Sequence, residues 1–202
     1  MIKKIVLTAI ALVSFLTVNA EAAISEDIVK ESIVKHSVEM GIDPALALSI
    51  AKKESGFKHE LKSPYGAVGV FQVLPSTAKK IGYNPYYLNE NIKAGLTYYK
   101  MMYKMFGSTE LALAAYNAGP GNVKKYGGTI PPFKETKRFV NIIMQDYQHF
   151  KNNPDPAIAK YNTKTAIAPE KQTEIEQKKE FDLPDLKEIP ETRQNDPVME
   201  IL

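Results

Sequence analysis

The sequence predicts an all-α domain, and three observations support this prediction. Apolar residues in the middle of the chain recur at intervals of three and four, as on one face of a helix. Most of these segments are bounded by residues typical of helix starts and stops, with Ser, Asp or Asn before and Gly after. No segment alternates apolar and polar residues as a half-buried strand does. A chain of 202 residues suits one such domain, of about 125 residues, with extensions.

Six helical segments are predicted in this domain, over about residues 25–41, 43–55, 75–82, 89–107, 108–119 and 135–150. Three residues are placed to cap their starts: Ser25, Asn89 and Ser108. The second helix is the most clearly marked. Asp43 can accept hydrogen bonds from free backbone N–H groups, and Pro44 at the first helical position loses none. Gly56 provides the stop.

The N-terminal residues 1–22 have the pattern of a secretory signal peptide. Lys3 and Lys4 form a basic start, residues 5–18 are apolar, and small residues suited to cleavage follow. An uncleaved membrane anchor is the alternative, but the apolar run is shorter than the ~20 residues that a span needs. We therefore expect a periplasmic or secreted protein. The chain has no Cys, so export brings no disulfide and the fold must rely on its core.

The C-terminal residues 151–202 differ in composition from the domain. They hold 8 basic and 11 acidic residues, several prolines and few apolar residues. Such a segment cannot bury enough surface to offset the entropy lost on ordering. The prediction is a disordered, acidic, proline-containing tail, with a short helix over 169–181 left open as an alternative.

Three linked segments hold the residues with chemical potential. Glu54 closes the apolar run 45–51 and is followed by Ser-Gly-Phe. Residues 63–72 read Ser-Pro-Tyr-Gly-Ala-Val-Gly-Val-Phe-Gln, and residues 114–121 read Ala-Ala-Tyr-Asn-Ala-Gly-Pro-Gly. One acid at a helix end, a Gly-rich polar loop and a Tyr-Asn pair are a plausible site for cleaving a sugar chain. A lone Glu after a helix would instead be a solvated residue.

Together with residues 91–95 and 128–136, these segments resemble the soluble lytic transglycosylase (SLT) domain. This family is lysozyme-like and cuts the glycan strands of bacterial peptidoglycan. The match covers about residues 28–150, so the resemblance implies a lysozyme-like helical domain over 24–150. Two departures bear on the shape of the sugar subsites. Val70-Phe71 stands where the family has Leu-Met, and Phe139 where it has Tyr.

Glu54 is the predicted catalytic residue, acting as the general acid that protonates the glycosidic oxygen. That role requires an apolar setting, which keeps a carboxyl protonated near neutral pH. Ordinary glycosidases need a second carboxylate, yet residues 63–72 and 114–121 contain none, and Glu60 is expected to be solvated. This lack fits the mechanism that the resemblance implies. There the substrate's N-acetyl group stabilises the charge, and Glu54 then deprotonates the C6 hydroxyl to close a 1,6-anhydro-MurNAc ring.

Five further residues match family positions that bind substrate: Ser63, Gly69, Gln72, Tyr116 and Asn117. Ser63 can bond the Glu54 carboxyl or the acetamido group, or it can be a turn residue. Gln72 offers a bidentate amide to sugar and peptide groups, and Gly69 lets the backbone pass close to the sugar. Tyr116 can hold Glu54 or the acetamido carbonyl, or be a core tyrosine with a satisfied hydroxyl. For Asn117 the favoured interpretation is that it ties a helix end to a loop.

Charge and residue spacing limit the partners. Residues 24–150 hold 16 basic and 11 acidic residues, which suits an anionic wall polymer without being specific to one. No Lys/Arg cluster interleaves with aromatic residues as nucleic-acid binding needs, so nucleic acid is discounted. The three His are scattered, and we expect no metal and no cofactor.

The expected partner is peptidoglycan, and we expect a monomer. By analogy alone, a wall-spanning secretion or conjugation machine reached through the tail is a further candidate partner. Two rival functions stay open: a hydrolytic muramidase on the same fold, and a non-catalytic glycan-binding or assembly protein.

Overall fold

A computed structural model describes residues 24–167 of the chain. The predicted signal peptide over 1–22 lies outside the described residues. So do residues 168–202, which include most of the predicted tail and the helix considered over 169–181.

Helices are the only extended secondary structure among residues 24–167, which confirms the all-α prediction. In order they are α1 (Glu26–Glu39), α2 (Pro44–Ser55), α3 (Pro75–Lys80), α4 (Leu88–Phe106), α5 (Thr109–Ala118), α6 (Pro120–Lys125), α7 (Lys134–Asn152) and α8 (Pro156–Ile167). Between residues 24 and 167 the only β-type pairing is two isolated bridges, Lys62 with Val68 and Val68 with Val73. None of the helices described here is long and apolar enough to cross a membrane.

Helix α2 begins and ends as the sequence predicts. Asp43 Oδ1 accepts a hydrogen bond from the Ala45 N–H at 2.9 Å, with Pro44 at the first helical position. Gly56 closes the helix in the left-handed region at φ 58°. These caps fix the point at which the chain leaves α2, and therefore the position of the residues just before it.

The predicted cap of α4 is wrong. Tyr87, not Asn89, is the N-cap residue, and it makes no side-chain cap hydrogen bond. Asn89 lies in the first turn, where its Oδ1 accepts a hydrogen bond from Ser32 Oγ of α1 at 2.6 Å. A tertiary donor has taken the oxygen that a local cap would have used.

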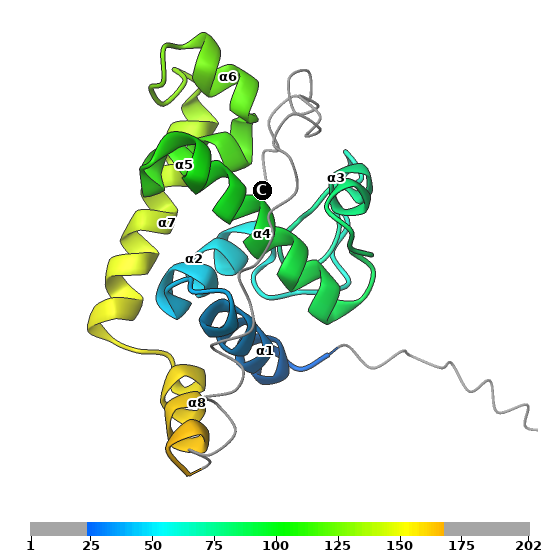
Figure 1. Cartoon of the computed structure of the whole chain (residues 1–202), viewed down its shortest axis with the longest axis vertical. Coiled ribbons are helices and arrows are strands. Elements are labelled where there is room, and N and C mark those ends of the chain that lie inside the picture. The colour runs from blue at the N-terminus through cyan, green and yellow to red at the C-terminus, as the bar shows by residue number, and fades with distance from the viewer. Residues whose placement is uncertain (1–23, 168–202) are drawn as a thin grey trace, which may run out of the picture.

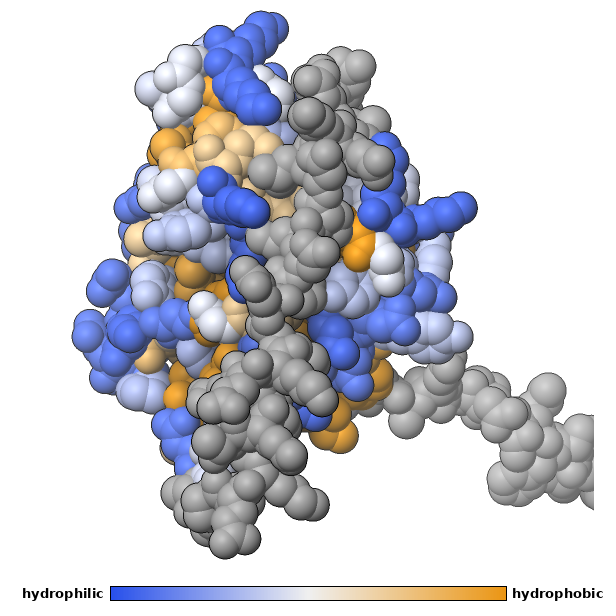
Figure 2. All heavy atoms as spheres, viewed as in Figure 1, coloured by the Kyte–Doolittle hydropathy of each residue, from blue (hydrophilic) through white to orange (hydrophobic). Residues whose placement is uncertain are grey.

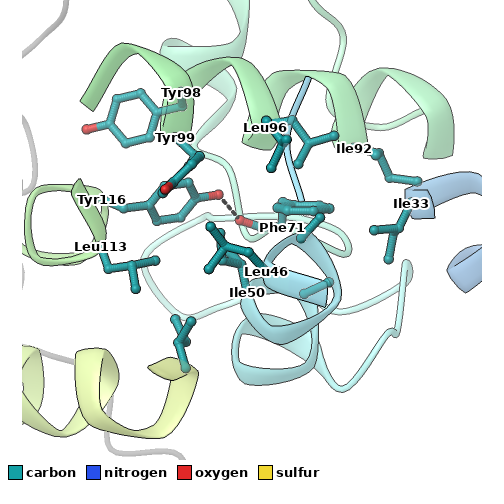
Figure 3. Packing of buried hydrophobic residues seen from close by; sticks show 14 of the residues in the cluster. Ile33, Leu46, Ile50, Phe71, Ile92, Leu96, Tyr98, Tyr99, Leu113 and Tyr116 are labelled. Atoms are coloured by element: carbon teal, nitrogen blue, oxygen red, sulfur yellow. Dashed lines mark hydrogen bonds between the residues drawn. The ribbon is translucent and has the colours of Figure 1, made fainter. Parts of the chain in front are cut away.

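The core is built around α2, which packs against α1 and α7, while α5 packs against α4 and α7 (Figure 1). Every residue from Ala45 to Ala51 is buried, so this stretch of α2 is enclosed on all sides. In Figure 3 Leu46 and Ile50 of α2 lie beside Phe71, with Leu96 of α4 and Tyr116 of α5 around them. The loop that carries Phe71 is thus part of the core.

The structure differs from the prediction after residue 150. Helix α7 continues to Asn152, and α8 packs against α1, so the disorder predicted from residue 151 does not hold for 151–167. Asp155 and Pro156 start α8 as Asp43 and Pro44 start α2, and the Ala157 N–H donates to Asp155 Oδ1 at 2.9 Å. Proline is favoured at the first position of a helix, so Pro156 begins α8 although prolines are typical of a disordered tail. The short helix α6 has no counterpart among the six predicted segments.

Candidate active site

Glu54 lies in the last turn of α2 with an exposed fraction of only 6%. It is four residues after Ile50, so the two side chains share a face of the helix, and Ile50 is fully buried beside Phe71 (Figure 3). Beyond it, Gly56 and Phe57 both have positive φ, 58° and 67°, which turns the chain sharply away. The carboxyl is therefore withdrawn from bulk water, unlike that of an ordinary glutamate at a helix end.

The loop 61–73 is fastened beside Glu54 through two adjacent backbone carbonyls. Ser55 Oγ donates a hydrogen bond to the Val70 carbonyl at 2.8 Å. The Tyr116 hydroxyl donates to the Phe71 carbonyl, also at 2.8 Å (Figure 3). One bond comes from the residue after Glu54 and the other from α5, so α2, α5 and the loop are joined at one place.

Asn91 of α4 holds the same loop from a third side, and sequence analysis gave it no role. Its Oδ1 accepts from the Phe71 N–H at 2.9 Å, and its Nδ2 donates to the carbonyls of Val68 at 2.8 Å and Pro85 at 3.0 Å. Gly95 follows one turn later. A Cβ there would lie 2.3 Å from Phe71 Cβ, so only glycine admits the ring. The spacing of Asn and Gly by four residues on one helix face was the available signal.

Ser63 closes a turn at the start of the loop. Its Oγ accepts from the Ala67 N–H at 3.0 Å, and its own N–H donates to the Ala67 carbonyl at 2.8 Å. The alternative of a turn residue therefore applies. A hydroxyl that accepts one hydrogen bond still has a proton to donate, so a contact with substrate remains a proposal.

Gln72 and Gly69 shape the loop rather than face outward. Gln72 is fully buried, with φ 44°, and its Nε2 donates to the carbonyls of Leu61 at 3.1 Å and Gly69 at 2.8 Å. With both amide protons used in this way, Gln72 does not offer the predicted bidentate amide to a sugar. Gly69 has φ 75°, and a Cβ there would lie 2.4 Å from Asn91 Nδ2. The close approach that it permits is to Asn91.

Tyr116 and Asn117 are neighbours in sequence with different surroundings. Tyr116 is 1% exposed and packs edge-on against Tyr98 with ring centroids 5.2 Å apart. Its bond to the Phe71 carbonyl makes it a core tyrosine that supports the site loop. Asn117 Oδ1 accepts from Thr136 Oγ1 at 2.8 Å. It ties the end of α5 to the first turn of α7. The sequence favoured a tie from a helix end to a loop, and the structure has a second helix as the partner.

The segment directly after Glu54 is supported by α1. Lys30 Nζ lies 4.8 Å from the centroid of the Phe57 ring and pairs with Glu26 at 2.6 Å and Asp155 at 3.2 Å. Burial alone would lower the pKa of Lys30, but the hydrogen bonds from Glu26 and Asp155 outweigh it and raise that pKa. A chain of contacts therefore runs from the start of α8 through Lys30 to the turn that follows Glu54.

Two carboxylates are buried among residues 24–167, Glu54 and Asp155. Asp155 pairs with Lys30 of α1. Glu60, the other acid near the site in sequence, is exposed as predicted. The arrangement offers one buried carboxyl beside a rigid, hydrogen-bonded loop.

The sequence is similar to those of known transglycosylases. The family model described as "Transglycosylase SLT domain" matches residues 31–140. The soluble lytic murein transglycosylase of Salmonella typhimurium is 35% identical, over 54% of this chain and 21% of that protein. The transglycosylase of Enterobacteria phage PRD1 is 28% identical, over 63% of this chain and 46% of that protein. The chain thus spans between a fifth and a half of the length of these relatives.

Solved structures share the helical fold. The 70-kDa soluble lytic transglycosylase of Escherichia coli has a TM-score of 0.52 and 30% identity, covering 62% of this chain and 25% of that one. An inactive mutant of lytic transglycosylase Slt from Pseudomonas aeruginosa, in which a glutamate is replaced by glutamine, has a TM-score of 0.54 and 26% identity. That match covers 62% of this chain and 25% of the other. A 70-kDa soluble lytic transglycosylase has also been solved in complex with bulgecin A, and its TM-score is 0.56.

Proposed function

Because this chain belongs to the transglycosylase SLT domain family, we propose that it is a peptidoglycan lytic transglycosylase with Glu54 as its catalytic residue. The proposed reaction cleaves the β-1,4 bond between MurNAc and GlcNAc and leaves a 1,6-anhydro-MurNAc end. The observation that carries the proposal is the burial of Glu54 at the end of α2, beside the loop 61–73.

Glu54 acts twice in this proposal. Its protonated carboxyl first gives a proton to the glycosidic oxygen, a poor leaving group until it is protonated. The resulting carboxylate then takes the proton of the C6 hydroxyl, whose oxygen bonds to the anomeric carbon and closes the anhydro ring. Donor and acceptor are the same group, so the cycle ends with Glu54 protonated again and no water consumed. An inactivating glutamate-to-glutamine change in the Pseudomonas aeruginosa relative supports one essential glutamate.

The lack of a second acid in the matched site segments favours this route over hydrolysis. A hydrolase with two carboxylates would need a second acid about 5–10 Å from the first. The loop segment 63–72 and the segment 114–121 contain no Asp or Glu, and Glu60 is exposed. The substrate's own acetamido group is proposed to stabilise the positive charge instead.

The remaining predicted site residues have unequal parts in the proposal. Ser63, with a hydroxyl proton still to donate, is proposed to bond the acetamido group or Glu54. Tyr116, Gln72 and Gly69 act through the loop that they support. Asn117 is proposed to fix α5 against α7, and through α5 the position of Tyr116.

The place of action is proposed to be outside the cytoplasm, on the wall. The signal-like pattern of residues 1–22 and the peptidoglycan substrate support this proposal. The protein is proposed to work as a monomer on glycan strands. A wall-spanning secretion or conjugation machine, reached through the C-terminal tail, is proposed as a further partner by analogy alone.

In the deciding experiment, purified peptidoglycan is digested with the wild-type protein and with Glu54→Gln, and the masses of the products are measured. Gln keeps the shape but cannot transfer a proton, so we expect turnover to fall by about 10²–10⁴-fold with folding unchanged. Products should carry anhydro ends, lighter by one water than hydrolysed ends. Glu60→Gln, which removes an exposed carboxylate nearby, is the control and should keep full activity.

Each rival function has its own signature in this assay. Products heavier by one water than anhydro-ended fragments would show that the enzyme is a hydrolase. Binding to glycan without any cleavage by the wild-type protein would indicate a non-catalytic protein. A folded Glu54→Gln protein with turnover within a few-fold of wild type would remove Glu54 from the catalytic role.

A further inference from the structure

Five exposed cationic side chains gather on α6 and at the start of α7: Lys124, Lys125, Lys134, Lys137 and Arg138. Lys134, Lys137 and Arg138 are three and four residues apart and so share one face of α7. Glu135 is the single acidic residue in the segment 120–138. Within the described part of the chain, none of the ion pairs involves any of the five cations. The result is a local excess of positive charge.

An aromatic pair joins the two groups of cations. The rings of Tyr126 and Phe133 meet edge to face, with centroids 5.6 Å apart at 87°. Lys125 precedes Tyr126 and Lys134 follows Phe133 in sequence, so a lysine flanks each ring. The sequence shows no basic cluster with aromatics because the two rings are seven residues apart in the chain and meet only in the fold.

The backbone holds this pair in a defined turn. Gly127 and Gly128 both have positive φ, 67° and 74°, and the Thr129 hydroxyl donates to the Tyr126 carbonyl at 2.7 Å. Tyr126 itself is 37% exposed. We call the set Lys124, Lys125, Tyr126, Phe133, Lys134, Lys137 and Arg138 the basic tip.

The basic tip lies at one end of the molecule. Figure 1 places α6 and the loop that follows it at the top of the long axis, at the end opposite α8. Figure 2 shows strongly hydrophilic residues at that end, with hydrophobic residues directly beneath them. A flat surface could therefore meet the tip without meeting the rest of the domain.

We propose that the basic tip docks on the surface of an anionic lipid bilayer. Lysine and arginine are attracted to anionic headgroups, and each adds roughly fivefold to binding at low salt. Tyrosine beside them suits the boundary between headgroups and acyl chains, where its apolar ring and its polar hydroxyl are both satisfied, and the ring of Phe133 adds apolar surface next to it. The edge-to-face contact covers part of a ring face, which makes the pair a poor stacking platform for sugars or nucleic-acid bases.

Binding to vesicles tests the proposal directly. The full-length protein is sedimented with vesicles of phosphatidylcholine alone and of an equimolar mixture with phosphatidylglycerol. It should bind only the anionic vesicles, and binding should fall steeply between about 0.05 and 0.5 M salt. The triple variant Lys124→Gln/Lys125→Gln/Lys134→Gln should bind about a hundredfold more weakly. Tyr126→Ser should weaken the binding that remains at high salt.

A matched control separates the tip from net charge. Lys79→Gln/Lys80→Gln/Lys104→Gln removes the same charge from exposed lysines of α3 and α4, and its binding should stay within about fivefold of wild type. Equal weakening by both triple variants, equal binding to neutral vesicles, or no binding to anionic vesicles would overturn the proposal. So would tip-dependent binding to purified glycan strands or nucleic acid without binding to vesicles. Cleavage of soluble glycan strands without lipid should be unchanged in both variants, so this result is independent of the enzymatic assignment.

Discussion

Phe71 is held in place by three residues of the surrounding helices. Its N–H is bound by Asn91, its carbonyl by Tyr116, and its ring fits where Gly95 has no side chain. Ser55 binds the carbonyl just before it. These bonds hold the site loop against the end of α2, so Glu54 faces a loop with little freedom to move.

Tyr116→Phe removes one of these bonds while keeping the ring. The Phe71 carbonyl would lose its buried donor, so we expect a destabilisation of about 1–3 kcal/mol. Turnover should fall less than in Glu54→Gln, because Tyr116 positions the loop and transfers no essential proton in the proposed cycle. Urea unfolding and glycan digestion measure the two effects. Tyr103→Phe, at a half-exposed ring, is the control and should change stability by less than about 0.5 kcal/mol.

Gly95→Ala tests the steric fit of Phe71. Alanine in place of glycine usually stabilises the middle of a helix by about 1 kcal/mol. Here the new Cβ would lie 2.3 Å from Phe71 Cβ, so we expect a net loss of about 1–3 kcal/mol instead. The double variant with Phe71→Leu should be less destabilised than the sum of the single variants. A stabilising Gly95→Ala would show that the loop can shift without cost.

Among the helices, α2 and α7 are joined at the N-terminus of α2. Asp43 caps α2 through one carboxylate oxygen, and its other oxygen accepts from Tyr147 at 2.9 Å and Lys151 at 3.0 Å, both on α7. Burial alone would raise the pKa of Asp43, but the hydrogen bonds from Lys151, the Ala45 backbone and Tyr147 outweigh it and lower that pKa. One side chain thus caps the start of the helix that carries Glu54 and anchors that helix to α7.

The lowered pKa predicts an acid-dependent loss of stability. A carboxyl whose pKa is lower in the folded state stabilises the protein fully above its unfolded pKa, about 4, and loses this contribution as the pH falls through the folded value. Asp43→Asn keeps a capping oxygen but has no charge. Wild type should therefore be more stable than Asp43→Asn at pH 7, and the difference should shrink below about pH 4. Urea unfolding of both proteins across this range makes the measurement, and a constant difference would contradict the assignment.

Over the whole molecule, the described residues form one helical body in which α8 belongs to the domain. The lysozyme-like helical fold predicted from the motifs is confirmed by the structural relatives. The predicted boundary at residue 150 cuts through the last turn of α7 and omits α8, which pairs Lys160 with Glu31 and Asp155 with Lys30. Since Lys30 lies against Phe57, removing α8 would disturb contacts that reach the turn after Glu54.

Two truncations test this boundary. A chain ending at Ile167 should keep the melting temperature and glycan-cutting activity of the full-length protein, because α8 remains. A chain ending at Asn153 should melt several degrees lower, since it exposes the face of α1 that α8 covers and breaks the pair of Lys30 with Asp155. Equal melting temperatures for the two truncated chains would mean that α8 contributes nothing to the domain.

The sequence by itself determined the features that depend on local chemistry. Helical spacing of apolar residues identified the main helices, and Asp43 and Gly56 marked the ends of α2. Both features depend on residues within a few positions of one another, where backbone geometry and capping act directly. Glu54 was singled out by its segment together with residues 63–72 and 114–121, because a lone Glu at a helix end would be a solvated residue.

Only the tertiary structure decided which distant group each polar side chain would meet. Gln72 is a polar residue in a polar loop, yet the fold buries it and binds its amide to the backbone. Asn89 was expected to cap α4, but its side chain instead accepts a hydrogen bond from Ser32 of α1. Asp155 begins α8 and pairs with Lys30 of α1. A hydrogen bond needs a partner within about 3 Å, and when that partner is tens of residues away, local sequence patterns do not reveal it. For these residues the fold, rather than the residue type, determines the role.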